Sequence, residues 1–342
     1  MRFFPGRPKI PAKENTVRRL VLTFAALLFG CSTPPSPVRD LSGWRIPPGF
    51  KIVGYFPSWS GNPELVRYEA LTHVNYAFAL VDATGTFRPV EAPEKLTEVV
   101  GKARAAGVKV MVSVGGWNEG NTSAFDRIAA DPVKTERFVT GARAFLDAFS
   151  LDGVDLDWEY PRAGTADRYA TLVEALAADL HGQGRELSLA VSAAEVNGKY
   201  VMDRAWEAAD WLNVMAYDDG WGGRTWVPHS SYSFTRAALD YWTGVRGVPQ
   251  AKVVLGVPFY GRSLVDRRPR SYRSLLEEFP EAEISDVAGA FAYNGPDTLR
   301  AKVVNQARVR AGGVMVWQLN QDARGPASLL SLIYDTVKEP AE

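Results

Sequence analysis

From about residue 50 onward, apolar strand-like runs alternate regularly with helical segments. Several of these runs are almost continuously apolar, which is typical of parallel strands covered by helices. Eight is the number of strands that closes a (β/α)8 barrel, and this chain contains eight such runs. The predicted strands are Phe50–Trp59, Thr72–Val81, Lys109–Trp117, Gly153–Tyr160, Leu187–Glu195, Trp211–Asp218, Lys252–Arg262 and Gly312–Asp322.

An open, doubly wound α/β sheet is the alternative to a closed barrel. Nucleotide-binding sheets of that kind have a Gly-rich phosphate loop after the first strand, and none follows residue 59 here. The longest insertion, residues 263–295, is too short and too weakly patterned to form a domain of its own. We therefore predict an α/β fold consisting of a single (β/α)8 TIM barrel.

Recognisable helix signals lie between the predicted strands. In Asp131-Pro132, the Asp is expected to cap a helix that begins at the Pro and ends near Phe149. Asn294-Gly295-Pro296 is expected to start, in a similar way, a helix that ends near Arg310. A third helix is predicted over Thr165–Leu180, with one apolar face formed by Leu172, Leu176 and Leu180.

The amino-terminal segment differs from the rest of the chain. Arg18-Arg19 precede an apolar run, Leu20–Phe29, which is too short to span a bilayer but has the length of a signal-peptide core. Cys31 follows, and then a Pro-rich polar stretch. We predict three parts: a lipoprotein-type signal peptide (1–30), a lipidated cysteine with a Pro-rich tether (31–48), and a barrel domain (49–338).

Leu28-Phe29-Gly30-Cys31 resembles the bacterial lipoprotein signal, in which the cysteine becomes the lipidated first residue. The resemblance implies an exported protein anchored to a membrane of the cell envelope, either the outer membrane or the cell surface, through Cys31. Secretion without an anchor and a chance apolar run are the alternatives.

The overall composition excludes some classes of function. The chain has 39 basic and 39 acidic residues, and this zero net charge argues against a nucleic-acid-binding protein. A single cysteine allows no disulfide within the chain. Ten Trp, thirteen Tyr and sixteen Phe would suit an aromatic-lined cleft that stacks on sugar rings, although core packing explains many aromatic residues equally well.

The fourth predicted strand carries a row of carboxyl groups, Asp155, Asp157 and Glu159. Alternate residues of a strand share a face, so these three point into the barrel, with successive members about 6.6 Å apart. The residues between them, which would pack under the surrounding helices, are Val154, Leu156 and Trp158.

Such a row is unfavourable as structure alone, because like charges in a low dielectric raise each other's pKa. It therefore indicates a functional site. Glu159 comes last, nearest the carboxyl end where barrel active sites open. A solvated acidic edge strand and an accidental cluster are alternatives. A calcium or magnesium loop is another, but its turn-forming glycine is missing after Gly153. We expect no metal and no cofactor.

These residues resemble the family 18 glycoside hydrolases, the chitinase family. Residues 152–159 (DGVDLDWE) match its DxxDxDxE signature. Residues 113–116 resemble its SxGG motif, and 215–218 its MxYD motif; 256–262 and 313–317 resemble its seventh and eighth strands. The likeness covers about residues 50–335 and makes the barrel domain a glycoside hydrolase catalytic domain.

The resemblance implies a retaining enzyme that cleaves β-1,4-linked N-acetylglucosamine polymers with help from the substrate's own 2-acetamido group. Glu159 would protonate the glycosidic oxygen and then activate water. Asp157 would hold the acetamido nitrogen and offset the positive charge of the intermediate. Asp155 would share a proton or hydrogen bond with Asp157, and Tyr217 would position the acetamido carbonyl.

Other residues at strand ends are expected to bind the sugar. Trp317 is the expected apolar floor of the site, and Gly115 and Gly116 are expected to allow close backbone packing. The family's large insertion after the seventh strand has no counterpart of sufficient length, so we expect a shallower, more open cleft. The remaining predicted cleft residues, for which core packing is the alternative, are Tyr55, Phe78, Trp117, Met215, Asp218 and Tyr260.

Other functions remain compatible with this sequence. The same mechanism could act on peptidoglycan glycan chains or on N-glycan cores, since it requires only an N-acetyl group beside the cleaved bond. A non-catalytic chitin-binding lectin on the same fold is a further alternative, although such relatives typically lose the acid that Glu159 provides here. A structural lipoprotein would leave the aligned carboxyls unexplained. We expect a monomer.

Overall fold

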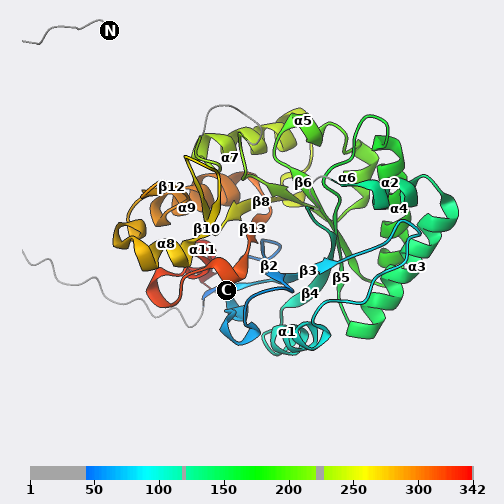
Figure 1. The fold of residues 1–342 in the computed structure, drawn as a ribbon, viewed down its shortest axis with the longest axis horizontal. Helices are drawn as coiled ribbons and strands as arrows, with labels where there is room; N and C mark the ends of the chain where they lie inside the picture. Colours follow the sequence, from blue (N-terminus) through cyan, green and yellow to red (C-terminus); the bar gives the residue numbers. More distant parts are fainter. Residues whose placement is uncertain (1–43, 118–120, 221–226, 341–342) are drawn as a thin grey trace, which may run out of the picture. The chain divides into compact units, whose positions relative to one another are not determined.

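A computed structural model describes residues 44–117, 121–220 and 227–340. The signal peptide, Cys31 and most of the predicted tether therefore lie outside the described residues. Residues 42–342 form one compact unit, built around a closed parallel barrel (Figure 1). The barrel order is β13-β2-β3-β4-β5-β6-β7-β8, which confirms the predicted fold. Its strands are β2 (Lys51–Pro57), β3 (His73–Ala79), β4 (Lys109–Gly115), β5 (Gly153–Asp157), β6 (Glu186–Ser192), β7 (Trp211–Met215), β8 (Val253–Pro258) and β13 (Gly313–Trp317).

Helices surround the barrel, as the right-handed β-α-β crossovers of parallel sheets require (Figure 1). Among the described residues, none of these helices is both long enough and apolar enough to cross a bilayer. The α-helices are α1 (Pro93–Ala105), α2 (Ser123–Ala129), α3 (Pro132–Phe149), α4 (Ala166–His181), α5 (Glu195–Gly198), α6 (Asp203–Ala208), α7 (Tyr232–Leu239), α8 (Tyr272–Glu278), α9 (Pro296–Lys302), α10 (Arg308–Arg310) and α11 (Leu329–Val337).

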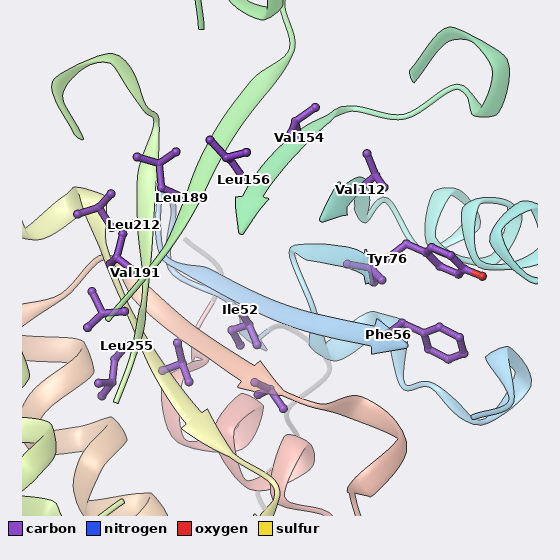
Figure 2. Close-up of a cluster of buried hydrophobic side chains, with 14 of the residues drawn as sticks. Ile52, Phe56, Tyr76, Val112, Val154, Leu156, Leu189, Val191, Leu212 and Leu255 are labelled. Atoms are coloured by element: carbon purple, nitrogen blue, oxygen red, sulfur yellow. The ribbon is translucent and has the colours of Figure 1, made fainter. Parts of the chain in front are cut away.

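Alternate residues of the barrel strands form two separate apolar layers. The outer layer packs between the strands and the helices, and Figure 2 labels some of its members, including Ile52, Val154 and Leu255. The inner layer is smaller and fills the barrel interior with Val53, Tyr55, Ala77, Met111, Trp211, Val254 and Met315. This division leaves the inner face of β5 to its carboxyl groups.

The predicted helix starts are confirmed with one correction. The Asp131 side chain accepts hydrogen bonds from the first turn of α3, as expected of a cap. The helix after Asn294 also begins at the expected Pro296, but its cap is Gly295 and no side chain caps it. Asn294 instead donates a hydrogen bond of 2.7 Å to the carbonyl of Ser230, because its amide is buried against the segment before α7.

All eight predicted barrel strands extend too far at their carboxyl ends. The fourth was expected to reach Tyr160, but β5 ends at Asp157. The seventh is divided at Phe259, where β8 ends and β9 (Tyr260–Ser263) begins in another sheet. Several residues beyond the strand ends, such as Trp59, Trp117 and Tyr217, are aromatic and line a cleft, so hydropathy alone does not reveal where each strand ends.

Residues 260–292 contain a small antiparallel sheet that the sequence analysis missed. Its strands run in the order β10-β9-β12-β11, and α8 lies between β10 and β11 in the chain. Apart from β9, the strands have only two or three residues, too few for an alternating pattern to show. They are β10 (Pro269–Ser271), β11 (Val287–Ala288) and β12 (Phe291–Ala292). A further pair, β1 (Trp44–Arg45) and β14 (Glu339–Pro340), joins the two ends of the described chain.

Candidate active site

A cleft of about 780 Å³ opens at the carboxyl ends of the barrel strands. The predicted residues that line it are Tyr55, Phe78, Trp117, Asp157, Glu159, Met215, Tyr217, Asp218, Tyr260 and Trp317. Of the predicted site residues only Asp155 lies below the cleft, inside the barrel. Of residues 263–295 only Pro269 reaches the lining, so this insertion contributes little to the cleft wall, as expected.

The three carboxyl groups of β5 and its extension form a column from the barrel interior to the cleft. Asp155 is completely buried and Asp157 is 4% exposed, whereas Glu159 is partly exposed in the cleft. Val154 and Trp158, which alternate with them, pack in the outer apolar layer. The strand period thus sets the column, as the sequence predicts.

Close packing between β4 and β5 supports the top of this column. A side chain on Gly115 would meet the Asp157 carbonyl at 2.2 Å, and one on Gly116 would meet the Phe78 ring at 2.6 Å. Gly116 also donates its backbone N–H to the same Asp157 carbonyl at 2.9 Å. Both glycines therefore serve backbone packing. Asp152, which begins the octapeptide, accepts a bond from the Val110 N–H at the start of the strand.

Asp155 accepts four hydrogen bonds. Tyr55 and Ser113 donate to Oδ2, both at 2.7 Å; Ser188 and Asn213 donate to Oδ1 at 2.6 and 3.0 Å. Burial raises the pKa of Asp155 above its usual value, although all four hydrogen bonds act against this shift. The arrangement stabilises a charge in the centre of the barrel.

Asp157 has a different environment. Its Oδ1 is buried without a hydrogen-bond partner among the described residues. Burial, and then the neighbouring charges of Glu159 and Asp155, raise the pKa of Asp157 well above its usual value. Of the two aspartates, Asp157 is therefore the one that retains a proton more readily.

Glu159 is suited to exchange a proton near neutral pH. Burial raises the pKa of Glu159 to about 7, and the charge of Asp218 adds to this effect, whereas a hydrogen bond from Tyr160 opposes it. A carboxyl group that titrates at this pH can act first as a general acid and then as a general base.

Tyr217 lies beside this column with its hydroxyl group available to a ligand. Among the described residues it donates to Met315 Sδ at 3.9 Å, a weak acceptor. Burial raises the pKa of Tyr217 well above its usual value, so the hydroxyl stays protonated and remains a donor.

Aromatic rings form one wall and the floor of the cleft. Trp317 lies with its ring centroid 5.4 Å from that of Tyr55 and 5.7 Å from that of Phe78. Trp59, which the sequence analysis missed, stacks on Phe78 at 5.9 Å and is 50% exposed. The alternation of side chains along a strand could have predicted it, since Trp59 is four residues after Tyr55 and falls on the same face. Trp117 lies at the cleft mouth, 55% exposed.

A charged network borders the opposite side. Asp218 accepts a hydrogen bond from Arg262 at 2.8 Å and lies 3.3 Å from His229 Nδ1. Although burial acts in the other direction, these two partners hold the pKa of Asp218 well below its usual value. Asp218 also has a φ of 60°, an uncommon backbone conformation for a non-glycine residue, which the network holds in place. Sequence reasoning found Asp218 but neither of its partners.

Other cleft residues were also missed. The loop between β6 and α5 contributes small or polar side chains that give no signal of a binding role in the sequence. Within the described residues, no group of three or more His, Cys, Asp or Glu side chains is arranged to hold a metal ion. The missed lining residues are Trp59, Tyr160, Ser192, Ala193, Ala194, Val196, Asn197, Asp219, Gly220, Phe234, Arg262, Pro269 and Gln321.

A closed barrel whose cleft combines a titratable carboxyl column with exposed aromatic rings is typical of enzymes that cleave glycosidic bonds. Residues 51–322 match the family Glycosyl hydrolases family 18. The chain therefore belongs to this family and is a glycoside hydrolase.

Individual relatives agree with this assignment. The endochitinase of Brugia malayi is 30% identical over 345 residues, covering 79% of this chain and 68% of that protein. The chain matches only 11% of the much longer probable chitinase 10 of Drosophila melanogaster, at 30% identity over 63% of this chain.

Solved structures share the fold. The GH18 chitinase ChiB of Flavobacterium johnsoniae has a TM-score of 0.76 at 26% identity, covering 84% of this chain and 94% of the other. A variant GH18 chitinase of Cycas revoluta, solved with (GlcNAc)4, has a TM-score of 0.74 at 25% identity, covering 84% and 99%.

Proposed function

We propose that this enzyme is a retaining glycosidase that hydrolyses chitin or chito-oligosaccharides by substrate-assisted catalysis. The observation that carries the proposal is the contrast between two neighbouring carboxyl groups. Glu159 is accessible and titrates near neutral pH, whereas Asp157 is almost completely buried with a strongly raised pKa. A protonated, buried Asp157 is poorly suited to attack an anomeric carbon, so the nucleophile is the acetamido oxygen of the substrate.

In the first step, Glu159 gives its proton to the glycosidic oxygen while the acetamido oxygen attacks the anomeric carbon. The bond to the leaving sugar breaks, and a cyclic oxazolinium ion forms. Tyr217 donates its hydroxyl proton in a hydrogen bond to the acetamido group and holds it in place. Asp157 accepts a hydrogen bond from the acetamido N–H, and the charge of Asp155 beneath it offsets the positive charge of the ion.

In the second step, the Glu159 carboxylate takes a proton from water while the water oxygen attacks the same anomeric carbon. The ring of the oxazolinium ion opens, which restores both the acetamido group and the acid. Two displacements at one carbon retain the β configuration. The aromatic wall of Trp317, Phe78 and Trp59 supplies flat apolar surfaces for sugar rings.

The test is hydrolysis of N-acetylglucosamine oligomers by the purified protein, with product size read by mass spectrometry and anomeric form by NMR. We expect short products with the β configuration immediately after cleavage. Initial products with the α configuration would overturn the retaining mechanism. No cleavage of any oligomer would overturn the chitinase activity.

Two other substrates share the required acetamido group, namely peptidoglycan glycan chains and N-glycan cores. Including both in the assay separates these activities from chitin hydrolysis. Oligomer binding without turnover of any substrate would instead identify a lectin, although the retained Glu159 favours an enzyme.

We also propose that the enzyme is exported and anchored through a lipid on Cys31, and that it acts as a monomer. The support for export and the anchor is the sequence Leu28-Phe29-Gly30-Cys31 with the preceding apolar run and the following Pro-rich stretch. Residues 46–50 then lead into the amino end of β2, the end of the barrel opposite the cleft.

A further inference from the structure

The four donors to Asp155 are not equivalent. Three are hydroxyl groups of Tyr55, Ser113 and Ser188, and a hydroxyl group can either donate or accept a hydrogen bond. The fourth is the side-chain amide nitrogen of Asn213, which only donates. The hydroxyls could adapt to a protonated Asp155 by turning, whereas the Asn213 nitrogen would still require an acceptor.

Trp211 fixes which end of the Asn213 amide faces Asp155. The indole Nε1–H of Trp211 donates to Asn213 Oδ1 at 3.1 Å, and both side chains are completely buried. Because an indole nitrogen only donates, its partner must be the amide oxygen, and the amide nitrogen must point the other way. That nitrogen lies 3.0 Å from Asp155 Oδ1 and 3.3 Å from both Tyr55 Oη and Ser188 Oγ.

The Trp211 ring is itself held at the amino end of the barrel. It lies with its centroid 5.0 Å from the His73 ring, and the Lys51 ammonium is 5.2 Å from the indole ring. His73 is in turn bonded to Glu186 at 3.2 Å. Not every buried asparagine in this barrel has its amide oriented by hydrogen bonds. Asn75, also inside the barrel, has no partner for its side-chain amide among the described residues.

We propose that Trp211 and Asn213 are positioning residues that keep Asp155 ionised. Protons in the column of carboxyl groups are then carried by Asp157 and Glu159. Trp211 donates a hydrogen bond to Asn213, and Asn213 donates one to Asp155. A turned amide would present an oxygen to the carboxylate, and the repulsion would be relieved only by a proton on Asp155. The inference concerns how Asp155 serves the proposed function and rests on that function for its catalytic consequence.

Other titratable groups surround Asp155, and Trp211→Phe, Asn213→Ser and Trp206→Phe all retain them. Asp157 and Glu159 lie above it on the same strand and its extension. Tyr55 on β2 and Tyr169 on α4 both interact with its charge, which contributes to the raised pKa of each tyrosine. None of them contacts the Trp211 N–H, so removal of that single donor isolates the effect of amide orientation.

The decisive variant is Trp211→Phe, which keeps an aromatic ring beside His73 and removes the N–H donor together with part of the indole ring system. Asn213→Ser is the second variant, because its hydroxyl group can bond Asp155 without a fixed direction. Trp206→Phe is the control, since it removes a similar indole bond of 3.0 Å to Asp203 on α6, away from the cleft. Thermal unfolding and circular dichroism of each variant establish that it is folded.

The measurement is a pH titration of aspartate carboxyl carbons by NMR in the free protein, assigned with Asp155→Asn and Asp157→Asn. In the parent and in Trp206→Phe we expect Asp155 to remain ionised at pH values where Asp157 is protonated. In Trp211→Phe and Asn213→Ser we expect the Asp155 midpoint to rise by about one pH unit, the effect of losing one fixed donor.

Protonation of Asp155 before Asp157 in the parent would overturn the proposal, as would an unchanged midpoint in both folded variants. If the parent cleaves chito-oligomers, Trp211→Phe should also lower kcat about tenfold with little change in KM. A parent without hydrolytic activity contradicts the proposed function and leaves the carboxyl titration as an independent test of the network.

Discussion

At the scale of single residues, the proposed mechanism depends on one proton at Glu159. In that mechanism the acid holds the proton to release the leaving sugar and lacks it to activate water. Burial and the nearby Asp218 charge bring its pKa to about 7, so both forms are populated near neutral pH. A glutamate in water, with an ordinary pKa near 4.3, would be almost entirely ionised at that pH.

Replacing Glu159 by Gln should lower kcat by roughly 10³-fold, because the amide can neither protonate the leaving oxygen nor activate water. The substitution keeps the size of the side chain, so binding of chito-oligomers should change little. Turnover assays with calorimetric binding of the same oligomer measure both quantities. Loss of binding together with turnover, in a folded variant, would contradict the assigned role.

The pH dependence of kcat/KM should reflect the protonation of Glu159. The free enzyme needs protonated Glu159 for the first step, so activity should decline above about pH 7, approaching tenfold for each further pH unit. Asp218, held ionised by Arg262 and His229, should not titrate in this range. A pH–rate profile from pH 5 to 9 on a soluble oligomer provides the measurement. A flat profile between pH 7 and 9 would contradict Glu159 as the acid.

At the scale of elements, a buried lysine on α9 holds Ser230, just before α7. Lys302 Nζ donates to Ser230 O at 2.7 Å, Ser230 Oγ at 2.9 Å and Asn294 Oδ1 at 2.7 Å. Ser230 in turn donates to the carbonyl of Ala216, next to Tyr217. Lys302 therefore connects the insertion and α9 to the end of the strand that carries Tyr217.

This lysine should give stability a distinct pH dependence. Burial lowers the pKa of Lys302 from 10.5 to about 7. Between these values the unfolded chain binds a proton that the folded protein lacks, so stability rises with pH. Relative to Lys302→Met, the parent should gain at most about 4 kcal/mol of unfolding free energy between pH 7 and 10.5. Urea unfolding at several pH values measures the difference, with Lys95→Met as control. Parallel stability curves would contradict it.

The sequence predicts the helices and strands whose pattern of apolar and polar residues lies within one continuous stretch of the chain. Eight apolar runs predict the barrel strands, and the alternation around Asp155 predicts which side chains enter the interior. The same alternation applied to the first strand would have added Trp59. Asp131 can likewise be predicted as a helix cap, because the residues that identify it and the backbone groups that it caps are close together in the sequence.

Features that depend on contacts between distant segments could not be predicted in this way. His229 and Arg262 meet Asp218 from 11 and 44 residues away along the chain. Asn294 looked like a cap but bonds Ser230, 64 residues away. Strands β11 and β12 have only two residues each, too few for a periodic sequence pattern to predict them.

At the scale of the whole molecule, the topology puts the cleft and the entry of the chain into the barrel at opposite ends. All eight barrel strands are parallel, so their carboxyl ends and the cleft lie at one end of the barrel. The chain enters β2 at the other end, after residues 46–50. The tether proposed to follow Cys31 thus leads into the end of the barrel that does not form the cleft.

Replacement of Cys31 by Ser tests that anchor. Without the thiol no lipid can be added, and the hydrophobic contribution of acyl chains, about 0.8 kcal/mol for each buried CH2, is lost. We expect the variant to move from the membrane fraction to the soluble exported fraction, with the kcat and KM of the catalytic barrel unchanged on a soluble oligomer. Ser32→Ala, next to the cysteine, should stay in the membrane fraction. Membrane partitioning equal to that of the parent would contradict lipidation, whereas loss of activity in the soluble variant would contradict the separation of anchor and cleft.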